Sequence, residues 1–281
     1  MKYTRYCRSM LSTPALQTDR FRKSHEADAD ICMVDLEDSI PPWDKDTARN
    51  LAARFFVPPA PARCAIRINT LTTPDGLRDL LAIRDYPTKP AIVVVPMVES
   101  PRDIEVAESV LVRTCPDVEF LAVVETPRGV ENANAIAAAS PRLRALIFGS
   151  ADYSFLAGVR LAWDTLVHAR ARLVNAARAA GIEVIDAPTF EISEHATIKE
   201  DAVRAHDLGF SGKIAIHPRQ VPVINEAFSP DTATLEKARR IVAAGQENGR
   251  KIAVVDGAMV GIPFFEASQH LIEEFGDLLH S

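Results

Sequence analysis

Short hydrophobic runs in this chain alternate with longer stretches of helical spacing, and several runs end on acidic residues. The clearest are residues 31–34, which lead into Asp35, residues 120–124, which lead into Glu125, and residues 145–148, which precede Gly149 and Asp152. Apolar runs of about four to eight residues between helical stretches are typical of strands buried on both faces. Carboxylates at their ends would lie at the mouth of the sheet, where α/β proteins bind ligands.

The whole pattern predicts eight strands in succession, at residues 6–11, 31–36, 65–69, 91–95, 120–125, 145–149, 183–186 and 213–217. Stretches with helical spacing follow them at 18–27, 44–55, 75–83, 101–113, 128–139, 163–180, 195–208 and 218–227. This alternation predicts that residues 1–228 form a (β/α)8 TIM barrel. The alternative is a doubly wound open sheet, which usually carries a Gly-rich loop after its first strand, whereas this turn reads Ser12-Thr13-Pro14-Ala15.

Residues 229–281 lie outside the eightfold pattern. They predict a charged helix at 234–248, a strand-like piece at 251–255 and a final helix at 263–279. We expect this C-terminal extension to act as a lid or an oligomerisation element.

Composition narrows the class of protein. A hydrophobic fraction of 47% supports a large core, and the net charge of −6 argues against nucleic acid as the main partner. Four cysteines without C-x-x-C pairing predict buried free thiols in a reducing compartment. Neither a signal-peptide core nor an apolar run of about 18 residues is evident. We therefore expect a soluble, cytoplasmic protein without a membrane partner.

The strand-end side chains suggest a metal site. Glu125 and Asp152 have no cation close in sequence, and an oxygen-only pair of acids suits Mg²⁺ or Mn²⁺. Such an ion can bind a hydroxy or keto acid and stabilise an enolate. Arg67 ends the third strand and offers a forked donor to substrate oxygens. Purely structural roles are the alternative for these residues. Arg67 is then an ion-pair partner, and Glu37 or Asp38 is the N-cap of the next helix.

Several segments together resemble a known family. They are R-S-M-L-S-T-P at 8–14, V-D-L-E-D-S-I at 34–40, I-R-I-N at 66–69, V-E-T-P-R-G-V at 124–130, F-G-S-A-D at 148–152, G-K-I-A-I-H-P at 212–218 and D-G-A-M-V at 256–260. In this order they resemble the citrate lyase beta-subunit-like branch of the HpcH/HpaI aldolase family, which includes citryl-CoA, malyl-CoA and citramalyl-CoA lyases.

The resemblance implies a Mg²⁺-dependent lyase that cleaves a 3-hydroxyacyl-CoA to an acyl-CoA and a 2-oxo acid through a metal-stabilised enolate. It implies Glu125 and Asp152 as metal ligands and Arg67 as the contact to substrate oxygens. An acidic cluster, Asp35, Glu37 and Asp38, would hold that arginine and the metal-bound waters. It further implies an acyl-CoA or acyl-carrier substrate, with basic residues for the CoA phosphates at Arg20, Lys23, Lys45 and Arg49. A homotrimer or hexamer is implied, in which the C-terminal segment covers a neighbour's site.

The chain departs from the family pattern at three positions. Ala15 stands where a Gly is usual, Met97 where a Lys is frequent, and Gly261 where the tail motif ends in an acid that takes part in proton transfer. Because Gly261 cannot move a proton, other functions stay open. They are a CoA-free 2-oxo acid aldolase, an acyl-CoA thioesterase on the same fold, and a non-catalytic thioester-binding paralogue.

Overall fold

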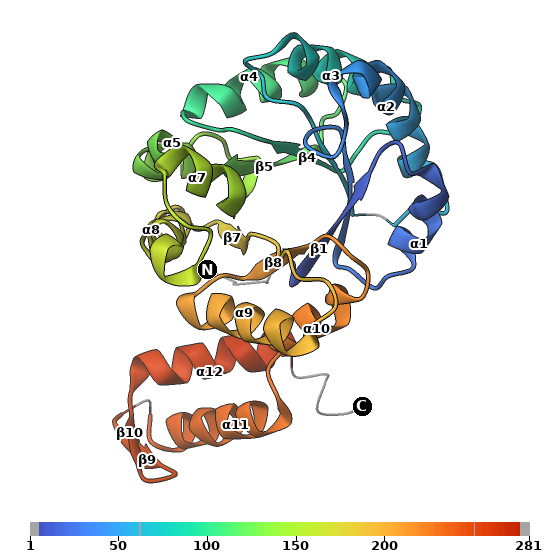
Figure 1. Ribbon diagram of the computed structural model, residues 1–281. Coiled ribbons are helices and arrows are strands. Elements are labelled where there is room, and N and C mark those ends of the chain that lie inside the picture. The colour runs from blue at the N-terminus through green and yellow to red at the C-terminus, as the bar shows by residue number, and fades with distance from the viewer. Residues whose placement is uncertain (1–5, 62, 250, 276–281) are drawn as a thin grey trace. The chain divides into compact units, whose positions relative to one another are not determined.

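The computed structural model describes residues 6–61, 63–249 and 251–275, and it contains a closed barrel of parallel strands in chain order (Figure 1). The strands are β1 (Ser9–Pro14), β2 (Ile31–Asp35), β3 (Cys64–Arg67), β4 (Ile92–Val95), β5 (Glu119–Val124), β6 (Leu143–Phe148), β7 (Glu183–Asp186) and β8 (Gly212–Ala215). Pairing of β8 with β1 closes the barrel. The predicted (β/α)8 fold is confirmed, and the open sheet is wrong.

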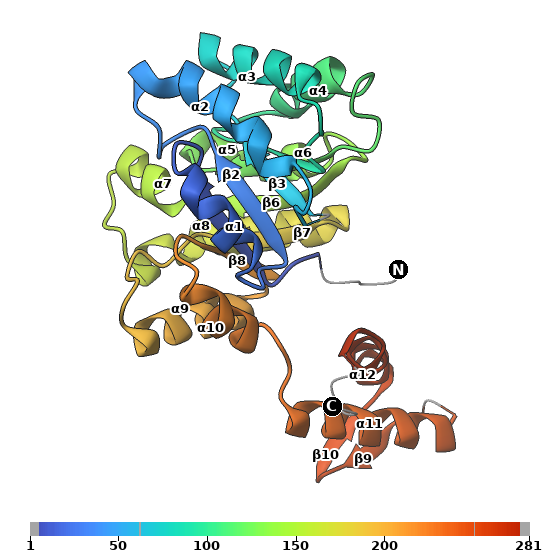
Figure 2. The same cartoon turned by 90° about the vertical axis from the view of Figure 1, so that its right-hand side faces the viewer.

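Helices surround the strands, as the view from the side shows (Figure 2). They are α1 (Phe21–His25), α2 (Lys45–Ala52), α3 (Pro74–Asp85), α4 (Pro101–Leu111), α5 (Pro127–Glu131), α6 (Ala133–Ala137), α7 (Ser150–Ala157), α8 (Trp163–Ala180), α9 (His195–Leu208) and α10 (Gln220–Ala227). Three of them, α3, α4 and α5, have a hydroxyl residue at the N-cap and proline at the first helical position. The hydroxyl oxygen accepts a free backbone N–H group, and the proline fixes φ in the first turn.

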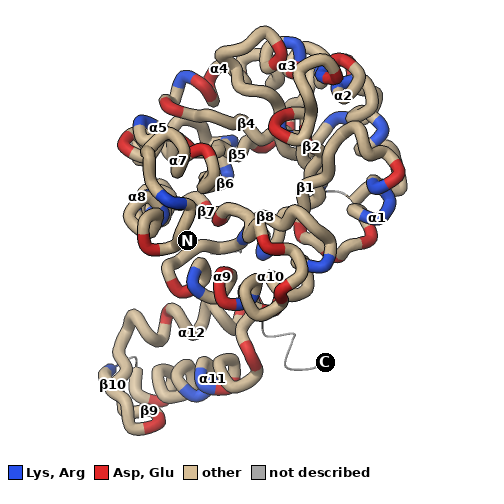
Figure 3. Tube along the Cα trace, viewed as in Figure 1, with Lys and Arg blue, Asp and Glu red and all other residues tan. Residues whose placement is uncertain are grey.

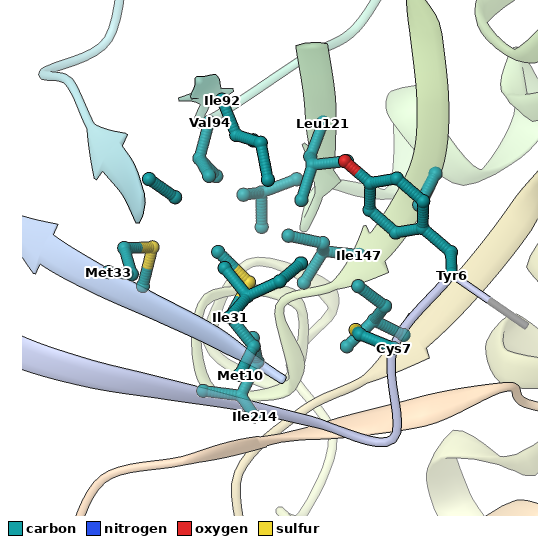
Figure 4. Packing of buried hydrophobic residues seen from close by; sticks show 14 residues of the cluster. Tyr6, Cys7, Met10, Ile31, Met33, Ile92, Val94, Leu121, Ile147 and Ile214 are labelled. Carbon is teal, nitrogen blue, oxygen red and sulfur yellow. The ribbon is translucent and has the colours of Figure 1, made fainter. Parts of the chain in front are cut away.

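Apolar side chains from the strands fill the barrel interior (Figure 4). Met10, Ile31 and Leu121 are fully buried there. Five other members of this cluster also form the floor of a cavity above it: Met33, Val94, Val123, Ile147 and Ile214. The packed core therefore forms the apolar base of the cavity at the mouth of the barrel.

Two differences between the predicted and observed elements bear on the site. The first strand runs from Ser9 to Pro14 rather than over 6–11, because Pro14 pairs as the last residue of the strand and its missing N–H is not needed there. The sequence pattern also missed α7, so Asp152 lies in the first turn of a helix and not at the end of a strand. The signal was present, since Gly158 adopts the left-handed conformation that ends α7.

Contacts divide the chain into a barrel unit, Tyr6–Asn225, and a C-terminal unit that begins at Glu226. The C-terminal unit contains α11 (Thr232–Glu247), a hairpin of β9 (Ala253–Val255) and β10 (Ala258–Val260), and α12 (Ile262–Phe275). Asp256 and Gly257 turn the hairpin with φ values of 51° and 78°, which is the preference of an Asp-Gly turn. A small core forms from Ile241, Val255, Val260 and Phe265. The predicted helix residues 276–279 lie outside the described residues.

The cysteines are free and buried, as the sequence predicts: Cys7, Cys32, Cys64 and Cys115. Among the described helices, none combines the length and apolar character that crossing a bilayer requires.

Candidate active site

A cavity of about 380 Å³ lies at the carboxyl ends of the barrel strands. Five of the predicted site residues line it: Asp35, Asp38, Arg67, Glu125 and Asp152. They lie on β2, β3 and α7 or directly after β2 and β5, so the fold collects residues more than a hundred positions apart. In Figure 3 the acidic segment that follows β2 appears red beside the end of that strand.

Arg67 is clamped by the acidic segment. Its Nε donates to Oδ1 of Asp35 and its Nη2 donates to Oδ2, both at 2.7 Å, while Nη1 donates to Asp38 at 3.1 Å. The backbone N–H groups of Glu37 and Ser39 also donate to Asp35. Burial alone would raise the pKa of Asp35, but the charge and hydrogen bonds of Arg67 outweigh it, and the pKa is lowered. Asp35 is thus a buried anion that fixes the guanidinium.

Glu37 occupies a different position from its neighbours. Among the described acids of this segment, Asp35 and Asp38 line the cavity, whereas Glu37 does not. Its Oε2 lies 2.8 Å from Nη1 of Arg67 but has no aligned hydrogen bond. Burial, reinforced by the nearby charges of Glu125, Asp38 and Asp35, raises the pKa of Glu37 to about 9. The charge of Arg67 opposes this rise, and Arg67 is the cation nearest to the Glu37 carboxyl.

Glu125 is held by a backbone amide. Met97 has a left-handed φ of 53°, and its N–H donates to Oε1 of Glu125 at 2.7 Å. Burial raises the pKa of Glu125 to about 7, the Met97 hydrogen bond opposes this rise, and the charge of Asp152 adds to it. The pKa of Asp152 is raised too, by burial and then by the charge of Asp38. Neighbouring buried carboxylates disfavour each other's charged form, and a cation bound between them would favour it.

These residues fit a magnesium ion. Oε2 of Glu125 lies 2.2 Å from the point where a Cβ of residue 149 would be, so only Gly149 leaves room for the carboxylate. Mg²⁺ is commonly held by one or two carboxylates, with waters or substrate completing an octahedron. No group of three or more His, Cys, Asp or Glu side chains suited to a metal occurs in the described part of the chain. The pair Glu125 and Asp152 therefore matches magnesium better than a closed structural zinc site.

The predicted CoA-contacting residues divide into two groups. Arg20 and Lys23 are exposed and line a second cavity of about 370 Å³ together with His217. Burial and the positive charges of Arg219, Lys23 and Arg20 lower the pKa of His217. Among the lining residues the cations Arg20 and Lys23 outnumber the one acid, Asp19, so this cavity is electropositive. It shares Ser12, Pro14 and Ile216 with the central cavity.

The other two basic residues face inward. Nζ of Lys45 donates to the backbone carbonyls of Leu36 and Glu37. Arg49 is buried, and its guanidinium contacts three carboxylates, those of Asp46, Asp75 and Asp79. This network gives Arg49 a structural role, because its buried guanidinium is paired with the fully buried carboxylate of Asp79, and loss of either partner would leave a buried charge.

Three other polar residues at or just after the ends of strands do not line the central cavity. Asn69 donates to Asp79, Asp186 accepts from Arg170 and Lys213, and Glu99 lies 3.6 Å from Arg128. Sequence reasoning missed the contributions of Gly149 and of the Met97 amide. A glycine directly after a buried strand was the available signal for the first, and backbone geometry alone reveals the second.

Comparisons with known proteins show which family the chain resembles. The family model described as HpcH/HpaI aldolase/citrate lyase matches residues 8–218. The chain is 29% identical to an L-malyl-CoA/beta-methylmalyl-CoA lyase of Rhodobacter capsulatus, with 95% of this chain and 94% of that protein covered. It is 31% identical to a (3S)-malyl-CoA thioesterase of Cereibacter sphaeroides, with 90% and 89% covered. The chain also resembles the crystal structure of CitE from Mycobacterium tuberculosis with magnesium, acetoacetate and coenzyme A. The TM-score is 0.83 and the sequence identity 30%, with 97% of this chain and 99% of that chain covered.

Proposed function

The chain belongs to the HpcH/HpaI aldolase/citrate lyase family, and we propose that it is a magnesium-dependent carbon–carbon lyase. Its substrate would be a 3-hydroxyacyl-CoA of the malyl-, citramalyl- or citryl-CoA type, cleaved to an acyl-CoA and a 2-oxo acid. The observation that carries the proposal is the meeting of Arg67, Glu125 and Asp152 in one cavity of about 380 Å³. A bound Mg²⁺ would supply Lewis-acid polarisation of the hydroxy-acid oxygens.

The residues of the chain have distinct parts in this reaction. As a base takes the hydroxyl proton, the hydroxyl oxygen becomes the carbonyl oxygen of the 2-oxo acid and the carbon–carbon bond breaks. The electron pair of that bond forms the enolate of the acyl-CoA, which then takes up a proton. Arg67 faces the enolate oxygen, where negative charge grows, so its contribution is larger in the transition state than in the ground state. Asp35 keeps the guanidinium in place. Glu125 and Asp152 would hold the metal.

The CoA portion would occupy the electropositive cavity. Arg20 and Lys23 would contact phosphates there, and the pantetheine arm would pass Ser12, Pro14 and Ile216, which line both cavities. The crystallised relative that was determined with coenzyme A supports this class of ligand. Arg49 is left out of this set because it is buried among carboxylates.

A homotrimer or hexamer is part of the proposal, with residues 229–281 as the lid over a neighbour's site. The C-terminal unit supports it by exposing large apolar side chains, at Ile252, Val254, Met259, Ile262 and Phe264. An apolar surface of this kind is typical of an interaction site. Molar mass in solution, measured by light scattering, tests the assembly.

One experiment tests the activity. The protein is incubated with Mg²⁺, glyoxylate or pyruvate, and acetyl- or propionyl-CoA, and the products are identified by mass spectrometry. A lyase forms the hydroxyacyl-CoA in this direction. The second candidate is a thioesterase, favoured by Gly261 and by the 31% identical malyl-CoA thioesterase. Release of free CoA and hydroxy acid from malyl-CoA, without any acyl-CoA product, would establish that candidate and overturn the lyase.

A further inference from the structure

Lys45 is directed toward the backbone behind the acidic segment. Its Nζ donates to the carbonyl oxygen of Leu36 at 2.8 Å and to that of Glu37 at 2.7 Å. Lys45 is the first residue of α2, so the helix carries its ammonium to the loop that follows β2. Two main-chain acceptors hold this charge, which is a different use from contact with a phosphate.

The Leu36–Glu37 peptide connects Lys45 to the clamp on Arg67. The carbonyl of this peptide accepts from Nζ of Lys45, and its N–H donates to Oδ1 of Asp35 at 3.0 Å. One rigid peptide plane therefore carries a hydrogen bond on each side. A cation at the carbonyl polarises the peptide and strengthens the bond that its N–H donates.

Asp35 passes this constraint to Arg67. Oδ1 of Asp35 accepts both the Glu37 N–H and Nε of Arg67, so a shift of the peptide moves the carboxylate that orients the guanidinium. We propose that Lys45 is a positioning residue for Arg67, acting through the Leu36–Glu37 peptide and Asp35. Lys45 touches no reacting atom in this arrangement.

The kinetic test rests on the proposed lyase function and compares two thioesters. Acetyl-CoA carries the nucleotide phosphates, and acetyl-pantetheine lacks them. Lys45→Met should lower kcat about 10- to 100-fold with both thioesters, as loss of an outer hydrogen-bonding partner does, while KM changes little. Lys45→Arg keeps a charged donor and should recover most of kcat. A loss confined to acetyl-CoA, appearing as a raised KM, would assign Lys45 to the CoA phosphates and overturn the positioning role.

Lys23→Met provides the matched comparison. Lys23 is exposed and lines the electropositive cavity. Its loss should raise KM for acetyl-CoA and leave acetyl-pantetheine unaffected, which is the opposite pattern to Lys45→Met. Equal behaviour of the two variants would contradict the proposal.

A second measurement is independent of turnover. Exchange of the Arg67 Nε–H with solvent is followed by ¹⁵N NMR, the signal being assigned by its absence in Arg67→Lys. This proton is hydrogen-bonded to Asp35 at 2.7 Å. Its exchange should accelerate in Lys45→Met and return toward the wild-type rate in Lys45→Arg. If no lyase activity exists but exchange accelerates, the proposed function fails and the positioning role stands. An unchanged exchange rate in Lys45→Met overturns the positioning role.

Discussion

Asp35 and Arg67 form a two-point ion pair in which both carboxylate oxygens accept from the guanidinium at 2.7 Å. Asp35 is 1% exposed, whereas the side chain of Arg67 retains 18% exposure on the cavity side. The pair therefore fixes the direction of a cation that still reaches the ligand space. Such a fork is specific to arginine, because lysine offers a point charge.

Arg67→Lys should lower kcat about 10²-fold or more, by analogy with losing an oxyanion donor. Lysine keeps the charge but cannot satisfy Asp35 at two points while also facing the substrate. Steady-state kinetics with malyl- or citramalyl-CoA measure the effect. An unchanged kcat together with reduced thermal stability would show that Arg67 is structural only.

Glu125→Gln should abolish turnover and weaken Mg²⁺ binding while the fold stays intact. The amide oxygen of Gln can still accept the Met97 N–H that now reaches Oε1, so the side chain keeps its place and loses its charge. Calorimetric titration with Mg²⁺ measures the loss. Glu99→Gln is the control, since Glu99 lies outside the cavity and faces Arg128. Normal Mg²⁺ binding by Glu125→Gln would remove Glu125 from the metal site.

Gly149→Ala should impair Mg²⁺ binding without removing a carboxylate. The added methyl would lie 2.2 Å from Oε2 of Glu125, so the carboxylate must leave its position. Displacing a ligand in this way should lower affinity about 10- to 100-fold. Titration with Mg²⁺, combined with circular dichroism as a check on the fold, measures the effect. Affinity equal to wild type would show that Glu125 binds the ion from another rotamer.

Stabilisation by Mg²⁺ should increase with pH. The ordinary pKa of a glutamate is 4.5 and burial raises that of Glu125 to about 7, so the folded protein binds the extra proton in this window. Without metal, the contribution of Glu125 to the free energy of unfolding is therefore lost as the pH rises from about 4.5 through 7. The cation compensates the charge that appears, so the Mg²⁺-induced rise in Tm should be larger near pH 8 than near pH 5.5.

Thermal unfolding with and without Mg²⁺ at the two pH values measures this difference. Burial also raises the pKa of Asp152, so its carboxylate contributes to the same trend. In Glu125→Gln the pH dependence should therefore be smaller than in the wild type but still present. A Mg²⁺-induced shift that is equal at both pH values would contradict the assignment of the titration to Glu125.

Gly261→Asp should raise lyase turnover if the C-terminal unit closes over a site. Gly261 precedes α12, and its carbonyl accepts the N–H groups of Phe264 and Phe265. A Cβ there would have Ile252 as its nearest neighbour at 4.0 Å, so Asp has room and suits the helix start. Turnover of malyl- or citramalyl-CoA is measured against Gly261→Asn, which caps equally well but cannot transfer a proton. Wild-type cleavage at about 10 s⁻¹ would show that another residue supplies the acid.

Much of the fold could be predicted, because each buried strand is a short apolar run and α8 and α9 end at glycines. Asp35 and Glu125 were found for the same reason, since each directly follows such a run. The orientation of charged residues on α2 could not be predicted. In the sequence, Lys45 and Arg49 are indistinguishable from solvated cations on a helix surface. Only the fold shows that Lys45 donates to the Leu36 carbonyl and that Arg49 donates to Asp79.

Met97 restricts how this site can change by mutation. Its φ of 53° is costly for any residue with a side chain and most costly for a β-branched one. Val, Ile and Thr at this position would therefore turn the amide away from Glu125, whereas Gly or Asn would accept the same backbone. At position 97, tolerance of a substitution should therefore depend first on whether the new residue adopts a positive φ, and only then on its polarity or size. In a library randomised at this position, the functional variants should be enriched in residues that accept this backbone conformation.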